Sequence, residues 1–143
     1  MKRAVAGVLG VLALAGCGGS GLEAEWPGPP GPSANGTVAV GPFNDYLAKY
    51  EDYASSPEAL ATEFLRLDEQ TPAFTEISVT STGERHDLVL VVLGGRPNQS
   101  FLALDYRLDV AQQKDGWRLI SARFTQRCRP GRGHQGFSAA PCI

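Results

Sequence analysis

Apolar and polar side chains alternate with a period of two along most of the second half of this chain. Because successive side chains of a strand point to opposite faces, this period predicts a sheet with one packed face and one face in water. The clearest strand spans residues 102–110, and its apolar side comprises Leu102, Leu104, Tyr106, Leu108 and Val110. Lys114-Asp115-Gly116 is typical of a hairpin turn, so residues 117–126 are expected to return as the next antiparallel strand.

Two more strands are expected upstream of this hairpin. Residues 75–80 place Ile77 and Val79 on one side, and residues 87–93 form the continuous apolar run expected of a central strand covered on both faces. The four segments together predict a four-stranded antiparallel meander. Residues 37–40 are short and apolar enough to pair as a further edge strand.

Two helices are expected before the sheet. Four apolar residues recur at i, i+3, i+4 and i+7, the spacing of one helical face: Phe43, Tyr46, Leu47 and Tyr50. Ser56 followed by Pro57 indicates an N-cap and a proline in the first turn, and this second helix should run to about residue 69. The predicted fold class is therefore α+β, with two N-terminal helices packed on the four-stranded sheet.

This order of elements, which ends in Asp115-Gly116-Trp117-Arg118-Leu119, resembles the small cone-shaped domains of the NTF2-like and cystatin-like groups. The resemblance covers about residues 43–126 and implies a curved sheet wrapped around a helix. It implies little about activity, because NTF2-like domains include enzymes, ligand binders and adaptors. The buried Asp-His pair by which the enzymes are recognised has no match, since His86 and Asp87 lie at an expected turn.

The N-terminus predicts export. Lys2 and Arg3 precede an uncharged run of 12 residues, 4–15, which suits an export signal and is well short of the roughly 20 residues that span a bilayer. Leu14-Ala15-Gly16-Cys17 then resembles the lipobox of bacterial lipoproteins. This resemblance implies that residues 1–16 are removed and that Cys17, as the new N-terminus, carries acyl chains such as palmitate. The expected location is the cell membrane or outer membrane of a bacterium, facing the periplasm or the exterior.

The mature chain should contain one domain. Residues 17–143 number 127, which suffices for a single modest core. Residues 17–36 are rich in glycine and proline and are expected to form a flexible linker behind the lipidated cysteine. Residues 37–143 would then form the α+β domain and its C-terminal loop.

Cysteine pairing predicts a disulfide in that loop. If Cys17 carries lipid, Cys128 and Cys142 form an even pair in an export context, where disulfides persist. The closed ring of 15 residues would stabilise the fold by roughly 3 kcal/mol in the chain-entropy model. No metal site is expected, because only His86 and His134 are available and no CxxC or HxxxH spacing occurs.

The closed loop holds the candidate binding residues. Arg127, Arg129, Arg132 and His134 gather cationic groups in a glycine-rich segment that could bind an anionic ligand or a partner protein of the cell envelope. In the alternative interpretation the loop is structural and folds over an open end of the sheet. Asp105 and Asp109 share one strand face, which charges in water explain better than a catalytic carboxylate pair.

Composition and motifs narrow the function further. Removal of Lys2 and Arg3 leaves 11 of the 13 basic residues against 15 acidic ones, a net charge of −4 that does not suggest nucleic-acid binding. No nucleophile elbow or phosphate-binding glycine loop is present, so neither an enzyme nor a cofactor is expected. The leading hypothesis is a membrane-anchored interaction module.

A carrier of a small apolar ligand is the first alternative. It would require a cavity roofed by the helices and lined by Tyr46, Phe64, Leu104 and Tyr106. An enzyme of the cell envelope is the second alternative.

Mass spectrometry of the protein extracted from membranes tests the expected anchor. We expect the chain to begin at Cys17 with acyl chains attached, and Cys128 and Cys142 to be two hydrogens lighter than free thiols. An unmodified chain that begins at Met1 would contradict the expected location.

Overall fold

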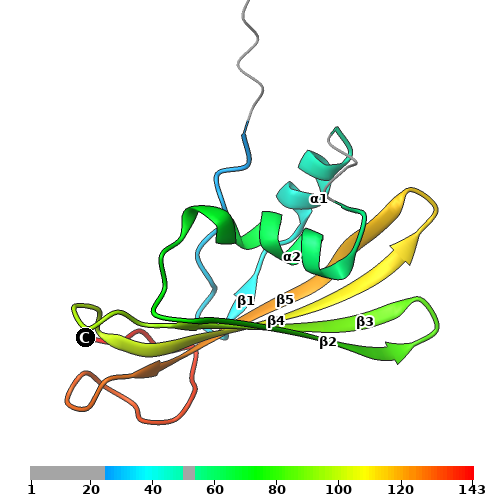
Figure 1. Ribbon diagram of the computed structural model, residues 1–143. Helices are drawn as coiled ribbons and strands as arrows, with labels where there is room; N and C mark the ends of the chain where they lie inside the picture. The colour runs from blue at the N-terminus through cyan, green and yellow to red at the C-terminus, as the bar shows by residue number, and fades with distance from the viewer. Residues whose placement is uncertain (1–24, 50–53) are drawn as a thin grey trace, which may run out of the picture.

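A computed structural model describes residues 25–49 and 54–143. Its dominant element is a five-stranded antiparallel sheet in the order β1-β5-β4-β3-β2. The strands are β1 (Thr37–Val38), β2 (Thr75–Gly83), β3 (His86–Gly94), β4 (Phe101–Gln113) and β5 (Gly116–Cys128). Two short helices, α1 (Gly41–Leu47) and α2 (Pro57–Leu65), lie on the same face of this sheet (Figure 1).

The predicted architecture of two N-terminal helices on a four-stranded cone is wrong, because a fifth strand completes the sheet and the helices are minor elements. A tight turn produces the fifth strand. Ser33 donates its backbone N–H to the Thr37 carbonyl at 2.8 Å, and Gly36 adopts a positive φ of 83° that favours glycine. The turn brings Thr37 opposite Arg123 of β5.

Both helices are shorter than predicted. The Ser56 hydroxyl accepts from the Ala59 N–H at 3.0 Å, which confirms the expected N-cap of α2. Arg66 then takes a left-handed φ of 51° and ends the helix, so only a 3-10 turn, η2 (Leu67–Glu69), follows it. Tyr50, expected on the apolar face of the first helix, lies outside the described residues.

The core lies between the helices and one face of the sheet. Fully buried side chains from both layers meet there: Phe43, Leu47, Leu60, Phe64, Val89, Val91 and Leu108. Among the described elements, no helix lies on the opposite face (Figure 1). The prediction that residues 87–93 are covered on both faces is therefore wrong, and Leu88, Leu90 and Val92 are only half-buried.

The glycine- and proline-rich segment joins the core much earlier than predicted. Trp26 is 5% exposed, and its indole N–H donates to the Phe64 carbonyl at 2.9 Å. The Trp26 ring meets the Phe43 ring edge-on at 5.0 Å. Glu25 forms an ion pair of 3.0 Å with Arg66 just beyond α2. Burial of this one large aromatic ring therefore fixes the chain at Trp26, within the segment expected to be a flexible linker.

Replacement of Trp26 tests its place in the core. We expect Trp26→Ala to lower the free energy of unfolding by about 3–5 kcal/mol, because it leaves a large cavity and an unsatisfied carbonyl. Trp26→Phe should lower the free energy of unfolding by less, because the smaller ring still fills part of the space. Urea unfolding gives the measurement, and Ile120→Ala serves as the control because Ile120 is 51% exposed. Equal losses for Trp26→Ala and Ile120→Ala would contradict the assignment.

Candidate functional site

The C-terminal loop is closed by the predicted disulfide. Cys128 ends β5 and is bonded to Cys142, with a Cα–Cα distance of 5.4 Å. The backbone N–H of Ile143 also donates to the Arg132 carbonyl at 2.9 Å. The disulfide fixes the C-terminal segment to the end of β5, and the hydrogen bond to Arg132 fixes it to the loop.

Arg129 connects this loop to the loop between β3 and β4. Its Nε donates to the Gln99 carbonyl at 2.9 Å, and its Nη2 lies 3.0 Å from the Gly95 carbonyl and 2.9 Å from the Arg96 carbonyl. The Arg129 backbone N–H also donates a hydrogen bond of 2.9 Å to the Ser100 carbonyl. Because the Arg129 guanidinium donates to three carbonyls of the β3–β4 loop, it fixes the shape of that loop.

His134 is engaged within its own loop. Nδ1 lies 2.7 Å from the Gly136 carbonyl, and Nε2 lies 2.8 Å from the Ala140 carbonyl and 3.3 Å from the sulfur of Cys128. A neutral imidazole has one N–H and can donate to only one of two carbonyls, whereas the imidazolium donates to both. The hydrogen bonds to Ala140 and then Gly136 therefore raise the pKa of His134 above 6.5, against a smaller opposing effect of burial.

The other two predicted cations project into water. Arg127 is exposed on β5 opposite Ala103, and Arg132 is exposed in the turn after Arg129. The four residues named from the sequence thus have separate surroundings, with Arg129 and His134 bonded to backbone carbonyls.

The sulfur atoms of Cys128 and Cys142 lie close to the His134 ring, the three ligand atoms falling within 4.8 Å of one another. Because the two sulfurs are bonded to each other, only His134 could donate to a metal ion in this state.

Asp105 and Asp109, considered above as a carboxylate pair, lie on the uncovered face of β4. Burial raises the pKa of Asp105, while neighbouring Arg107 opposes that rise. Asp109 accepts a hydrogen bond from the hydroxyl of Ser121 on β5.

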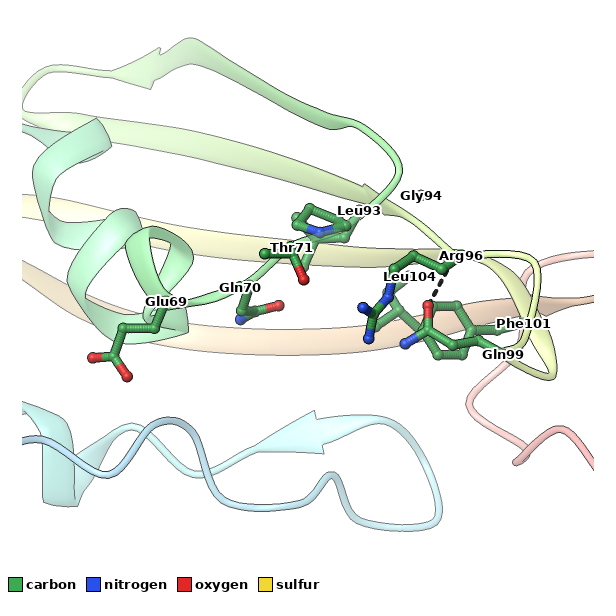
Figure 2. Close-up of a pocket in the computed structure, with 10 residues that line it drawn as sticks. Glu69, Gln70, Thr71, Leu93, Gly94, Arg96, Gln99, Phe101 and Leu104 are labelled. Carbon is green, nitrogen blue, oxygen red and sulfur yellow. Dashed lines mark hydrogen bonds between the residues drawn. The ribbon is translucent and has the colours of Figure 1, made fainter.

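A cleft of about 270 Å³ lies beside the loop that Arg129 holds. One wall is the segment that leaves η2, including Gln70, and the other is the β3–β4 loop with Arg96 and Gln99 (Figure 2). Leu93, Phe101 and Leu104 contribute its apolar lining.

Arg96 is the cationic group of this cleft. Its side chain extends from the loop toward the cleft, beside Gln99 (Figure 2). The Gln99 Oε1 accepts the Arg96 backbone N–H at 2.7 Å, which holds the Gln99 side chain against the backbone from which the Arg96 side chain extends. Within residues 25–49 and 54–143, the Arg96 guanidinium has no hydrogen bond or ion pair. Glu69 on the opposite wall is already paired with Arg66.

Two glycines let the cleft wall form. A Cβ at Gly94 would collide with the ring of Phe74, and a Cβ at Gly95 would collide with the backbone of Phe101. The Gly95 N–H donates to the Leu102 carbonyl at 2.8 Å, so the chain passes directly beside β4 before it reaches Arg96. The sequence signal for this site was a cation directly after two glycines, between two strands.

Comparison with family models, with curated proteins and with solved structures gives no match for this chain. In the ranges that the structure describes, no helix combines the length and apolar character needed to cross a membrane.

The pKa of His134 predicts a pH dependence of stability. A folded pKa above 6.5 stabilises the loop fully below the unfolded value, and this contribution is lost as the pH rises through the folded value. As the pH rises above 6.5, the melting temperature of the parent protein should fall. The melting temperature of His134→Ala should fall less steeply over the same range. His86→Ala should retain the parent slope. The same slope for His134→Ala and the parent would contradict this role.

Proposed function

We propose that this protein is a membrane-anchored binding module of the bacterial envelope that holds a small organic anion in the cleft beside Arg96. The observation that carries the proposal is an unengaged guanidinium next to an apolar lining. A carboxylate would accept two N–H groups of Arg96, while its hydrocarbon part would contact Leu104 and Phe101.

The cleft supports recognition through a preformed shape. Arg129 holds the β3–β4 loop through three carbonyls, so the backbone that carries Arg96 and Gln99 needs little reordering when a ligand arrives. Gln70 donates its amide N–H to the Leu65 carbonyl, which holds this side chain in place on the opposite wall. We therefore assign binding of the anionic ligand to Arg96 instead of the C-terminal arginines. Arg129 acts as a positioning residue.

Packing of the interior favours this function over the apolar carrier. Phe64 is fully buried, and Tyr46, Leu104 and Tyr106 pack against the same core. Trp26 lies against Phe43, Tyr46 and Phe64, with ring centroids 5.0 to 6.2 Å apart. Of the side chains proposed to line a helix-roofed cavity, Tyr46, Phe64 and Tyr106 thus contribute to the core instead, and Leu104 packs against the core from the side of the cleft.

Noncovalent binding also suits the residues of the cleft better than catalysis. Its lining contains no histidine or cysteine, and its carboxylate, Glu69, is held by Arg66. Acylation of Cys17 is the proposed anchor, and Cys17 itself lies outside the described residues.

Binding of 3-phenylpropionate tests the cleft. With protein extracted in detergent and empty micelles as the blank, we expect this acid to bind about 10-fold or more tightly than its uncharged amide, as a hydrogen bond to a charged group contributes about 1.5–3 kcal/mol. Arg96→Ala should remove the preference for the acid. Isothermal titration calorimetry gives both affinities.

Two variants separate the roles of the arginines. Arg129→Ala should weaken binding of the acid and lower the melting temperature together, because the loop loses its clamp. Arg132→Ala should change neither, because that side chain is exposed and lies outside the cleft. Equal affinity for acid and amide in the parent protein would refute the proposed ligand class, whatever the state of Cys17.

A further inference from the structure

The outer edge of β2 is the longest open strand edge of the described chain. β2 is last in the strand order and pairs only with β3, from Thr75 opposite Leu93 to Gly83 opposite His86. Of its nine residues only Val79 is partly buried, and the others are exposed. Along such an edge, every second residue directs its backbone N–H and C=O away from the sheet.

The opposite edge of the sheet is covered. β1 pairs with Ala122 and Arg123 of β5. Beyond β1, the Asn44 side chain donates to the Leu119 carbonyl at 2.8 Å and accepts the Leu119 N–H at 3.2 Å. Within residues 25–49 and 54–143, β2 has no such covering segment.

The composition of β2 favours pairing with another strand. Its sequence, TEISVTSTG, is rich in β-branched residues and contains neither proline nor lysine, two residues that protect natural edges. Glu76 is its one charged residue. Ile77, on the side of the helices, is 38% exposed.

We propose that β2 pairs antiparallel with β2 of a second copy of this chain, joining two sheets into one. The regular pairing of β2 ends at Ser81, where the register with β3 shifts before Gly83. The uninterrupted run is therefore Thr75 to Ser81, and the two-fold axis that pairs all of it passes through its central residue, Ser78.

This register is favourable for the side chains. Ile77 lies opposite Val79 of the second copy, and the same pair recurs across the axis, so two β-branched contacts form on the helix side. Glu76 lies opposite Thr80 of the second copy, so the two Glu76 carboxylates are four residues apart along the ladder, or about 13 Å. A second copy therefore fits this edge without opposing like charges. The proposal does not involve Arg96 or the cleft.

Cysteine cross-linking in the full chain, in isolated membranes, tests the register. Directly opposed residues of an antiparallel pair lie about 4.5–5.5 Å apart at Cα, within reach of a disulfide. We expect Ser78→Cys to give a thiol-reducible dimer on mild oxidation. Thr80→Cys should give no more dimer than the parent chain, because its own counterpart lies about 13 Å away.

Two further samples complete the design. Differently tagged Glu76→Cys and Thr80→Cys chains, produced together, should form a mixed dimer because these positions are opposed. Ile77→Lys added to Ser78→Cys should suppress the cross-link, since it places a charge on the helix side of the edge; its melting temperature reports whether the fold is retained. If this variant fails to fold, the comparison of Ser78→Cys with Thr80→Cys still tests whether two β2 strands pair in the proposed register.

Three results would overturn the proposal. They are a Ser78→Cys dimer no stronger than that of the parent chain, equal cross-linking at Ser78 and Thr80, or cross-linking of Ser78→Cys to a different protein in place of itself. The last would mean that the edge receives a strand from another partner.

Discussion

Packing of α1 and α2 on a single face of the sheet is the constraint on which the rest of the structure depends. Because the helices cover only one face, the apolar side chains of each strand must point to that face, and the core forms there. The aromatic rings of Trp26, Phe43 and Phe64 fill the space between the layers, so the helices need only seven and nine residues. Short helices of this length have little stability alone, and the sheet supplies the rest.

Local sequence patterns predicted the parts of the fold that depend on near neighbours. The Ser56 N-cap, the hairpin before Gly116 and the Cys128–Cys142 bond depend on residue type and spacing, and all three are confirmed. An edge strand was expected at residues 37–40 and is found at Thr37–Val38, but its partner strand could not be predicted. The turn at Gly36 directs the two residues of β1 onto β5, where Thr37 lies opposite Arg123, 86 residues further along the chain.

Trp26 and Arg96 show the limit of composition as a guide. Trp26 lies among prolines and glycines, which favour an extended spacer, yet burial of its ring and satisfaction of its N–H outweigh that preference. Arg96 was not identified as a candidate because the C-terminal loop contains more arginines. What distinguishes the two is hydrogen bonding, since Arg129 is occupied by three carbonyls while Arg96 faces the cleft. No spacing in the sequence encodes that difference.

Burial of Trp26 also sets how far the domain could stand from a bilayer. A tether from a lipidated Cys17 to residue 36 could extend over roughly 65 Å, whereas one that ends at Trp26 reaches only about 30 Å at full stretch. Under the proposed anchoring, the buried Trp26 ring would be the point at which the tether joins the domain. It would keep α2 close to the lipid headgroups and restrict the orientations of the sheet relative to the bilayer.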